Sequence, residues 1–346
     1  MNENSMLFYR MVRNFLTVYL PEQKASSPNT VKAYRNALNL LIEYTKECSG
    51  TPMSEISFDT ITREHMEGFL DWLEKANKCS VSTRNQRLSC IRSFYKYAGN
   101  RNITVMSCAQ ELGKIPVKKE AEVHELKYFS EDALKSILEQ PDPRNKKEIR
   151  DLFFMILMYD TAARNQEILD IRLKDMHVSI PESYVVVTGK GRKTRMVPIM
   201  EKTVEHFKKY IRIFHKNSSG DAYLFYTLRN GEQCQMSPDN TEKFIKKYGE
   251  LARKHNKEVP TNVHPHMFRH ARAMHLYRGG MPLPLLSEWL GHAQLNTTLI
   301  YANADTRMKQ EAIEKATSKI NPLKSDKPII DWEDDEDVIR KLYGLV

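Results

Sequence analysis

Two stretches carry most of the information in this 346-residue sequence: HPHMFRHARAMHL at residues 264–276 and LLSEWLGHAQLNTTLIYAN at residues 285–303. The first predicts a helix on which His266, Arg269 and His270 share one face, because they are spaced i, i+3 and i+4. Carboxylate or cysteine partners at ligand spacing are missing, so the sequence predicts no metal site. The second predicts a helix that ends near His292 and is followed by Tyr301. Taken alone, His270 could equally be a core histidine and Tyr301 a packing residue.

Two further motifs lie upstream of these stretches. Arg164 precedes Glu167 by three residues in RDLFFMILMYDTAARNQEILDI (150–171), which is apolar enough to form a buried helix. Lys190 occupies the Gly-Lys-Gly turn of SYVVVTGKGRKTRMVPIM (183–200), whose β-branched run and turn predict a β-hairpin. Each residue alone has an ordinary explanation: an intrahelical ion pair for Arg164 and Glu167, and a solvated turn lysine for Lys190.

The organisation of the chain follows from its periodicity. Helical periodicity predicts an all-helical module of four or five helices over residues 1–112. A linker is expected at 113–127, because the segment GKIPVKKEAEVHELKYF lacks periodicity. A second domain is expected at 128–320, and the tail at 321–346 ends in a short apolar stripe, DVIRKLYGLV. The expected fold class is mostly α with a small antiparallel β-sheet.

The composition indicates a globular protein and is compatible with a polyanionic partner, nucleic acid first and an anionic membrane surface second. The 53 Lys and Arg residues exceed the 44 Asp and Glu residues by nine, which is compatible with nucleic-acid binding. The five cysteines form no CxxC pair, so we expect neither a disulfide framework nor a zinc site, and a cytoplasmic location. No apolar run reaches the roughly 18 residues needed to span a bilayer, so no membrane partner is expected.

The order of these motifs along the chain resembles the tyrosine recombinase (integrase) family of site-specific DNA recombinases. The resemblance is strongest over about 125–310, where the His-x-x-Arg-His and Leu-Gly-His motifs are followed by Tyr301. SPNTVKAYR (27–35) and TRNQRLSCIRSFYKYA (83–98) are similar, with weaker motifs, to the core-binding domain of that family. The resemblance implies an N-terminal SAM-like helical bundle and a mixed α/β catalytic domain.

The resemblance also implies a set of six catalytic side chains with two supporting ones. The catalytic set is Arg164, Lys190, His266, Arg269, His292 and Tyr301, and the supporting residues are Glu167 and His270. The two arginines would grip the phosphate, Tyr301 would be the nucleophile and Lys190 the general acid. We expect His266 to act as the base and His292 to orient the phosphate. The first motif departs from the usual Thr-Gly-x-Arg, and we expect Ala163 to loosen the packing that aims Arg164.

The reaction implied by the resemblance is an exchange of phosphodiester bonds. Attack by the tyrosine would leave a 3′-phosphotyrosyl link and a free 5′-hydroxyl, and a second 5′-hydroxyl would reverse the step on another strand. Because the bond energy is conserved, no ATP, metal or other cofactor is expected. The sequence agrees, since it has neither a phosphate-binding G-x-x-x-x-G-K-[ST] loop nor a carboxylate cluster for two Mg²⁺ ions.

The implied partners are double-stranded DNA with short inverted repeats and three further copies of the chain, with tails exchanged between protomers. We expect DNA-facing side chains at Lys32, Arg35, Arg84, Asn85 and Arg87. Too few residues precede the first core-binding helix for a separate arm-site domain, so we expect a simple recombinase that integrates or excises a mobile element or resolves DNA dimers. The alternatives are a topoisomerase-like nicking and rejoining enzyme and a catalytically silent DNA-binding protein.

Overall fold

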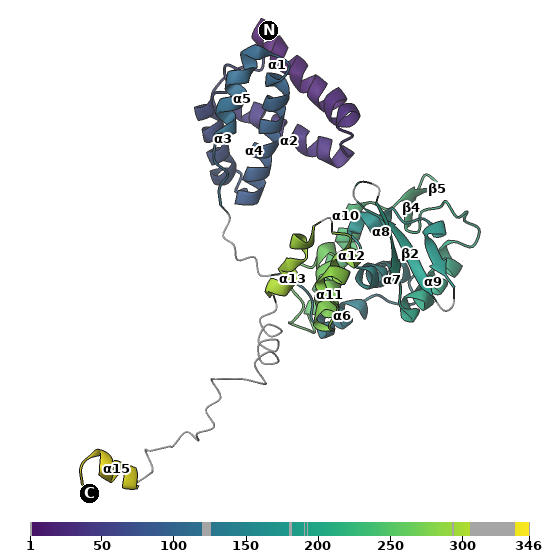
Figure 1. Ribbon diagram of the computed structural model, residues 1–346. Helices are drawn as coiled ribbons and strands as arrows, with labels where there is room; N and C mark the ends of the chain where they lie inside the picture. Colours follow the sequence, from purple (N-terminus) through teal and green to yellow (C-terminus); the bar gives the residue numbers. More distant parts are fainter. Residues whose placement is uncertain are drawn as a thin grey trace. The chain divides into compact units, whose positions relative to one another are not determined.

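The computed structural model describes residues 2–119, 126–179, 182–189, 191, 193–292, 294–304 and 336–345. It divides the chain into two compact units, Met1–His124 and Glu125–Val346 (Figure 1). The boundary falls inside the segment that the sequence assigns to the linker. The predicted fold class, mostly α with small antiparallel sheets, is confirmed.

Unit 1 is a bundle of helices (Figure 1), and its core is rich in aromatic side chains. Its elements are α1 (Glu3–Asn14), the π-helix η1 (Phe15–Gln23), α2 (Pro28–Cys48), α3 (Arg63–Lys75), α4 (Val81–Gly99), the 3-10 helix η2 (Ile103–Val105) and α5 (Met106–Gly113). Ser27, Thr62 and Ser80 cap α2, α3 and α4 by accepting a hydrogen bond from the backbone N–H three residues ahead. Phe8 and Phe94 meet edge to face in the centre, and both are fully buried.

Unit 2 combines helices with two small sheets. Its elements are α6 (Glu131–Leu138), α7 (Lys146–Thr161), α8 (Asn165–Leu169), the 3-10 helix η3 (Leu173–Asp175), β1 (Met176–Val178), β2 (Ser183–Thr188), β3 (Thr194–Pro198), α9 (Glu201–Phe214), β4 (Tyr226–Arg229), β5 (Glu232–Gln235), α10 (Pro238–Arg253), α11 (Pro265–Arg278), α12 (Leu283–Leu290), the 3-10 helix η5 (Leu295–Thr297), α13 (Leu299–Ala304) and α15 (Glu336–Leu342).

The predicted β-hairpin is confirmed. Strands β2 and β3 pair antiparallel from Tyr184–Pro198 to Thr188–Thr194, and β1 extends the sheet on the other side of β2. Val185, Val187 and Val197 turn inward and are buried, as alternation along a half-buried strand requires. Strands β4 and β5 form a second, separate hairpin.

Helices α9 and α11 pack most closely on α7, whose apolar residues lie in the core of unit 2 (Figure 1). Helix α10 fixes the chain just before α11 by a very close approach. A Cβ atom added to Gly249 would lie 2.5 Å from Cγ2 of Val263, so only glycine fits there without movement. This contact sets where α11, the helix with the His-x-x-Arg-His motif, begins.

Candidate active site

The turn between α7 and α8 positions Arg164. Helix α7 ends at Ala162, which adopts the left-handed conformation with φ of 50°. Arg164 then becomes the N-cap of α8, and its backbone N–H donates to Oε2 of Glu167 at 3.0 Å. The Arg164 side chain donates through Nη1 to Oε1 of the same carboxylate at 2.8 Å. Glu167 therefore holds both the main chain and the side chain of Arg164.

The departure from the usual Thr-Gly-x-Arg motif has a physical effect at Ala162. A left-handed conformation costs an alanine roughly 1–2 kcal/mol, whereas a glycine adopts it freely. Ala163 is 1% exposed and packs in the main core of unit 2. The expectation that Ala163 loosens the packing that aims Arg164 stays a prediction.

Helix α11 buries the second arginine. Arg269 is 4% exposed, and its guanidinium donates to the carbonyl oxygens of Ala162 at 2.6 Å and Leu290 at 2.7 Å. The side chain thus ties the end of α7 to the end of α12. Burial, and after it the nearby Arg164 charge, lowers the pKa of Arg269 to about 10, so the group stays cationic at neutral pH.

The C-terminal end of α12 positions the last histidine. Gly291 closes the helix in the left-handed conformation with φ of 63°, and its N–H donates to the Glu288 carbonyl. His292 follows, and its Nδ1 lies 2.8 Å from Oγ1 of Thr298, which is fully buried. This pair connects the end of α12 with the start of α13.

Tyr301 on α13 is buried next to the α11 motif. The tyrosine is 1% exposed and packs in a small cluster with residues of α11 and α12. Its hydroxyl lies 3.1 Å from Nδ1 of His270, so the contact with the phenol comes from His270 and not from His266, the expected base. The His266 ring is one turn away, with its centroid 6.4 Å from that of His270.

The charges of this cluster act on one another. Burial lowers the pKa of His270 and of His292 to about 4, and the neighbouring Arg269 adds to the effect in both cases. Burial raises the pKa of Tyr301, although the Arg269 and Arg164 charges work in the opposite direction. At neutral pH the site therefore holds neutral imidazoles, a neutral phenol and fixed guanidinium groups, an arrangement suited to binding an anion.

Glu167 is the buried acid that balances these cations. Burial would raise its pKa, but hydrogen bonds from Arg195 and Arg164, together with their charges, more than offset this and lower the pKa below its usual value. The carboxylate is 5% exposed and accepts a 2.8 Å ion pair from each arginine.

Seven of the eight residues that the sequence assigns to the site therefore lie around the first half of α11. They are Arg164, Glu167, His266, Arg269, His270, His292 and Tyr301. Lys190 lies outside the described residues. The preceding residue, Gly189, is next to the site, because a Cβ atom on it would lie 3.1 Å from Oε1 of Glu167.

Arg195 on β3 is a site residue that the sequence analysis did not single out. Its Nη2 donates to Glu167 at 2.8 Å, and its Nε donates to the carbonyl oxygen of Trp289 at 3.1 Å. A signal was present in the sequence, because position 195 shares the inward face of its strand with Val197. A charged residue at an inward position of a strand requires a buried partner.

The expected DNA-facing residues of unit 1 separate into two groups. Lys32 and Arg35 on α2 are exposed, and Arg87 on α4 is partly exposed. The prediction that Arg84 faces outward is wrong: it is 8% exposed, and its Nη1 donates to Asn85 Oδ1 at 3.0 Å and to the Pro116 carbonyl at 3.4 Å. Asn85 is also occupied, because its side chain pairs with the backbone N–H and carbonyl of Lys118. These two residues fasten the segment that follows α5.

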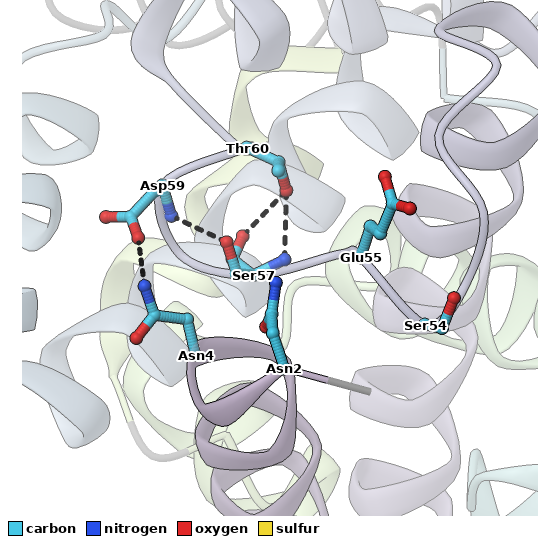
Figure 2. A pocket seen from close by; sticks show the side chains of 7 residues that line it. All are labelled: Asn2, Asn4, Ser54, Glu55, Ser57, Asp59 and Thr60. Atoms are coloured by element: carbon cyan, nitrogen blue, oxygen red, sulfur yellow. Dashed lines mark hydrogen bonds between the residues drawn. The ribbon is translucent and has the colours of Figure 1, made fainter.

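A polar hollow in unit 1 does not resemble a site. Figure 2 shows its lining residues, which come from the start of α1 and from the loop between α2 and α3. Their polar groups largely satisfy one another: Asn4 donates to Asp59 at 2.9 Å, and Thr60 Oγ1 accepts the Ser57 N–H at 2.9 Å. No group of three His, Cys, Asp or Glu side chains suited to a metal occurs in the part of the chain that the structure describes.

Comparison with known proteins identifies the class. Tyrosine recombinase XerA of Pyrococcus horikoshii is 29% identical over 85% of this chain and 90% of its own length, and tyrosine recombinase XerD of Vibrio cholerae is 28% identical over 83% and 90%. The fold is similar to XerH site-specific recombinase bound to palindromic difH substrate (TM-score 0.66, 19% identity, 90% of this chain and 88% of that one). It is also similar to the Tn1549 transposon integrase in complex with transposon right end DNA (TM-score 0.66, 15% identity, 91% and 99%).

Two family models match the chain. The phage integrase family model covers residues 127–308, and the phage integrase N-terminal SAM-like domain model covers residues 14–102. The chain therefore belongs to the phage integrase family, and it is an enzyme of the tyrosine recombinase type. None of the helices within the described ranges is both long and apolar enough to cross a membrane.

Proposed function

We propose that this chain binds duplex DNA at specific sites and cuts and rejoins it through a covalent link between Tyr301 and a DNA 3′-phosphate. The observation that carries the proposal is the gathering of two arginines, three histidines and one tyrosine around α11, with the Arg164 and Arg269 charges acting on Tyr301. The DNA-bound XerH and Tn1549 proteins, which have the same fold, support DNA as the substrate. We also propose that unit 1 is the core-binding domain and unit 2 the catalytic domain.

The chemistry is a transesterification in two steps. The Tyr301 oxygen forms a bond to the phosphorus and gives its proton to a base, while the bond to the 5′-oxygen breaks and that oxygen takes up a proton. Arg164 and Arg269 stabilise the negative charge on the non-bridging oxygens. Because guanidinium groups supply this charge and the phosphotyrosyl bond stores the energy, we propose a reaction that needs neither a metal nor ATP.

We propose proton carriers and a phosphate ligand among the histidines and Lys190. His266 is exposed and its pKa is lowered by burial of part of the ring and by His264, so it can accept a proton from the phenol in a complex with DNA. We propose that His292 orients the phosphate. His270 holds the hydroxyl in the form described above, and Lys190 remains the proposed general acid.

The buried phenol indicates that α13 must move before attack. Tyr301 is 1% exposed and cannot contact a duplex in this form. The connection between α12 and α13 is suited to such a movement, because Gln294–Thr297, Leu299 and Ile300 are exposed and Thr298 is buried. We propose that binding to DNA releases Tyr301 from His270.

The tail supports a proposal for assembly. Helix α15 carries Leu342, and Tyr343 and Leu345 follow it; these three side chains are 65%, 74% and 73% exposed. We propose that they are buried against another copy of the chain in a tetramer on two duplexes, and that this assembly integrates or excises a mobile element or resolves DNA dimers. Lys32, Arg35 and Arg87 are the proposed phosphate contacts, and the free thiols suit a cytoplasmic location.

The test is the capture of a covalent adduct. The protein is incubated with a library of nicked duplexes of randomised sequence, and complexes that survive denaturing detergent are isolated and their DNA is sequenced. We expect the wild-type protein to form such adducts without metal or ATP and Tyr301→Phe to form none. Tyr277→Phe is the matched control, because Tyr277 is partly buried and packs against the same cluster.

The outcomes are distinct. An adduct that persists in Tyr301→Phe, or one that disappears equally in Tyr277→Phe, would contradict the assignment of the nucleophile. An adduct that forms only with an added divalent metal would contradict the metal-independent mechanism and leave the nucleophile in place.

A further inference from the structure

We infer that Arg195 is a positioning residue that fixes three separate parts of the active site relative to one another. It is the shared contact of the β2–β3 hairpin, the Arg164–Glu167 pair and the C-terminal end of α12. The inference rests on the proposed function, and it adds a residue to which neither the motifs nor the resemblance assigned a role.

The first contact of Arg195 fixes the carboxylate that aims Arg164. Nη2 of Arg195 donates to Oε2 of Glu167 at 2.8 Å, and Oε1 of the same carboxylate accepts from Arg164 at 2.8 Å. The Arg195 side chain is 14% exposed, whereas that of Arg164 is 37% exposed. Arg195 is thus the inner cation of the pair, and Arg164 is the more exposed one.

The second contact of Arg195 fixes the end of α12. Two successive carbonyl oxygens there each accept from an arginine: Trp289 from Nε of Arg195 at 3.1 Å and Leu290 from Nη2 of Arg269 at 2.7 Å. Carbonyls at a helix C-terminus carry partial negative charge, so they are suited to guanidinium groups. Arg195 therefore steadies the turn that positions both Arg269 and His292.

Gly291 makes room for the Arg195 side chain, and Gly189 lies within ordinary contact distance of it. A Cβ atom on Gly291 would lie 3.0 Å from Nη1 and 3.2 Å from Cδ of Arg195, and one on Gly189 would lie 3.5 Å from Nη1. Gly189 is also the hairpin residue before Lys190, and its N–H donates to the Lys193 carbonyl at 2.8 Å. Arg195 also pairs with Val187 across the β2–β3 hairpin. It therefore connects the hairpin end that carries Lys190 with Glu167 and the C-terminal end of α12.

Only an arginine can serve all of these contacts. Its planar guanidinium directs Nε and Nη2 toward two partners at fixed angles, whereas a lysine has one nitrogen at the end of a flexible chain. Arg195→Lys therefore keeps the charge and loses one of the two contacts. Arg195→Met keeps much of the packing and loses both contacts.

The test compares these variants in two assays, using a duplex selected from the randomised library with wild-type protein. We expect Arg195→Met to form the Tyr301 adduct about a hundredfold more slowly in single-turnover experiments, and Arg195→Lys about tenfold more slowly, because a misaligned donor to the transition state costs such factors. The Kd for the duplex should change by less than about threefold, since the buried residue contacts no DNA. Arg150→Met is the matched control, because Arg150 is 17% exposed and ion-paired with buried Asp151 at 2.8 Å.

A pH profile separates positioning from a general loss of structure. The pKa of His292 is lowered by burial first, then by Arg269, Arg164 and Arg195, with a smaller effect from His270. Arg195→Met removes a charge that lowers the pKa of His292, so the pH below which the rate of adduct formation falls should move to a higher value. Arg195→Lys keeps the charge and should leave that pH unchanged. Arg150→Met should show the wild-type profile.

A double-mutant cycle with Glu167→Gln completes the test. If Arg195 acts through Glu167, the two substitutions together should slow the reaction by much less than the product of their separate factors. If Arg195→Met does not fold, Arg195→Lys and the cycle built on it carry the test. An Arg195→Met variant with the wild-type rate, or one whose rate falls only in proportion to its DNA binding, would overturn the inference. Absence of any Tyr301-dependent adduct in wild type would instead refute the proposed function, and the inference with it.

Discussion

The substitution Glu167→Gln gives the sharpest test of the site as an electrostatic unit. The Glu167 carboxylate is 5% exposed and accepts three hydrogen bonds: two from Arg164, through its backbone N–H and its side chain, and one from Arg195. Glutamine has nearly the same shape, so the packing is kept. It lacks the charge, and its amide N–H groups would point at guanidinium donors.

The magnitude follows from these contacts. Hydrogen bonds to charged groups contribute about 1.5–3 kcal/mol each, and breaking a buried ion pair costs about 3–5 kcal/mol. Glutamine keeps one acceptor oxygen, and Arg164, with a side chain 37% exposed, can recover hydrogen bonds to water. We therefore expect the free energy of unfolding to fall by about 3 kcal/mol at neutral pH, the low end of the range for a broken buried pair.

The effect should depend on pH with a defined sign. The interactions with Arg195 and Arg164 outweigh burial and hold the pKa of Glu167 below its usual value in the folded state. A carboxyl group of this kind contributes stability above its unfolded pKa of about 4.3, and the contribution is lost as the pH falls through the folded pKa. The difference between wild type and Glu167→Gln should be constant above about pH 5.5 and shrink below about pH 4.

The assay is urea unfolding followed by circular dichroism at a series of pH values. Glu148→Gln is the control: Glu148 is also ion-paired in unit 2, with Lys247 at 3.0 Å, but its side chain is 19% exposed and that of its partner 52%. We expect that control to change the unfolding free energy by less than about 1 kcal/mol. A Glu167→Gln protein as stable as wild type, or a difference that grows in acid, would refute the reasoning.

Three further predictions concern stability and binding. Gly249→Ala should lower the free energy of unfolding by about 1–3 kcal/mol in thermal denaturation, because the new Cβ would meet Val263 at 2.5 Å. Gly113→Ala, whose new Cβ would have nothing within 4 Å, should not lower it. Equal effects of the two substitutions would count against the close contact. Arg84→Met should lower the free energy of unfolding in urea by about 2 kcal/mol, because Arg84 is buried and hydrogen-bonded. Lys32→Met should leave that free energy unchanged and reduce the slope of log binding constant against log salt concentration for DNA by about one. The reverse pattern would restore Arg84 as a DNA contact. The pKa values of His270 and His292 are about 4 in the folded state, so the free energy of unfolding should fall as the pH drops from about 6.5 toward 4. The double variant His270→Gln, His292→Gln should show a weaker dependence of that free energy on pH. An unchanged pH dependence in the double variant would contradict the lowered pKa values.

Local signals in the sequence were sufficient for the elements that frame the site. The alternation of valines and the Gly-Lys-Gly turn predicted the β2–β3 hairpin, and the spacing of His266, Arg269 and His270 predicted a shared helix face. Arg84 shows where the reading of a local pattern failed. It precedes Leu88 by four residues and Ile91 by seven, so helical periodicity places it on the buried face with them.

Other features depend on contacts that no local pattern encodes. The burial of Tyr301 is produced by Ala162, Met274 and Leu290, which come from different helices. The left-handed conformation of Ala162 could not be read from the residue type, since alanine normally favours a helix. The role of Arg195 required the register of β3 together with the position of the end of α12.

In the proposed mechanism, the buried phenol also sets a threshold for when this enzyme can act. Extracting Tyr301 gives up the burial of an aromatic ring, about 1.5–3 kcal/mol, and one hydrogen bond of about 1 kcal/mol. An energy gap of that size leaves on the order of 0.1–1 per cent of free molecules with Tyr301 presented. Binding to unrelated DNA sequences would then seldom produce a nick. Only a site whose binding free energy offsets the cost of extracting Tyr301 makes the tyrosine available.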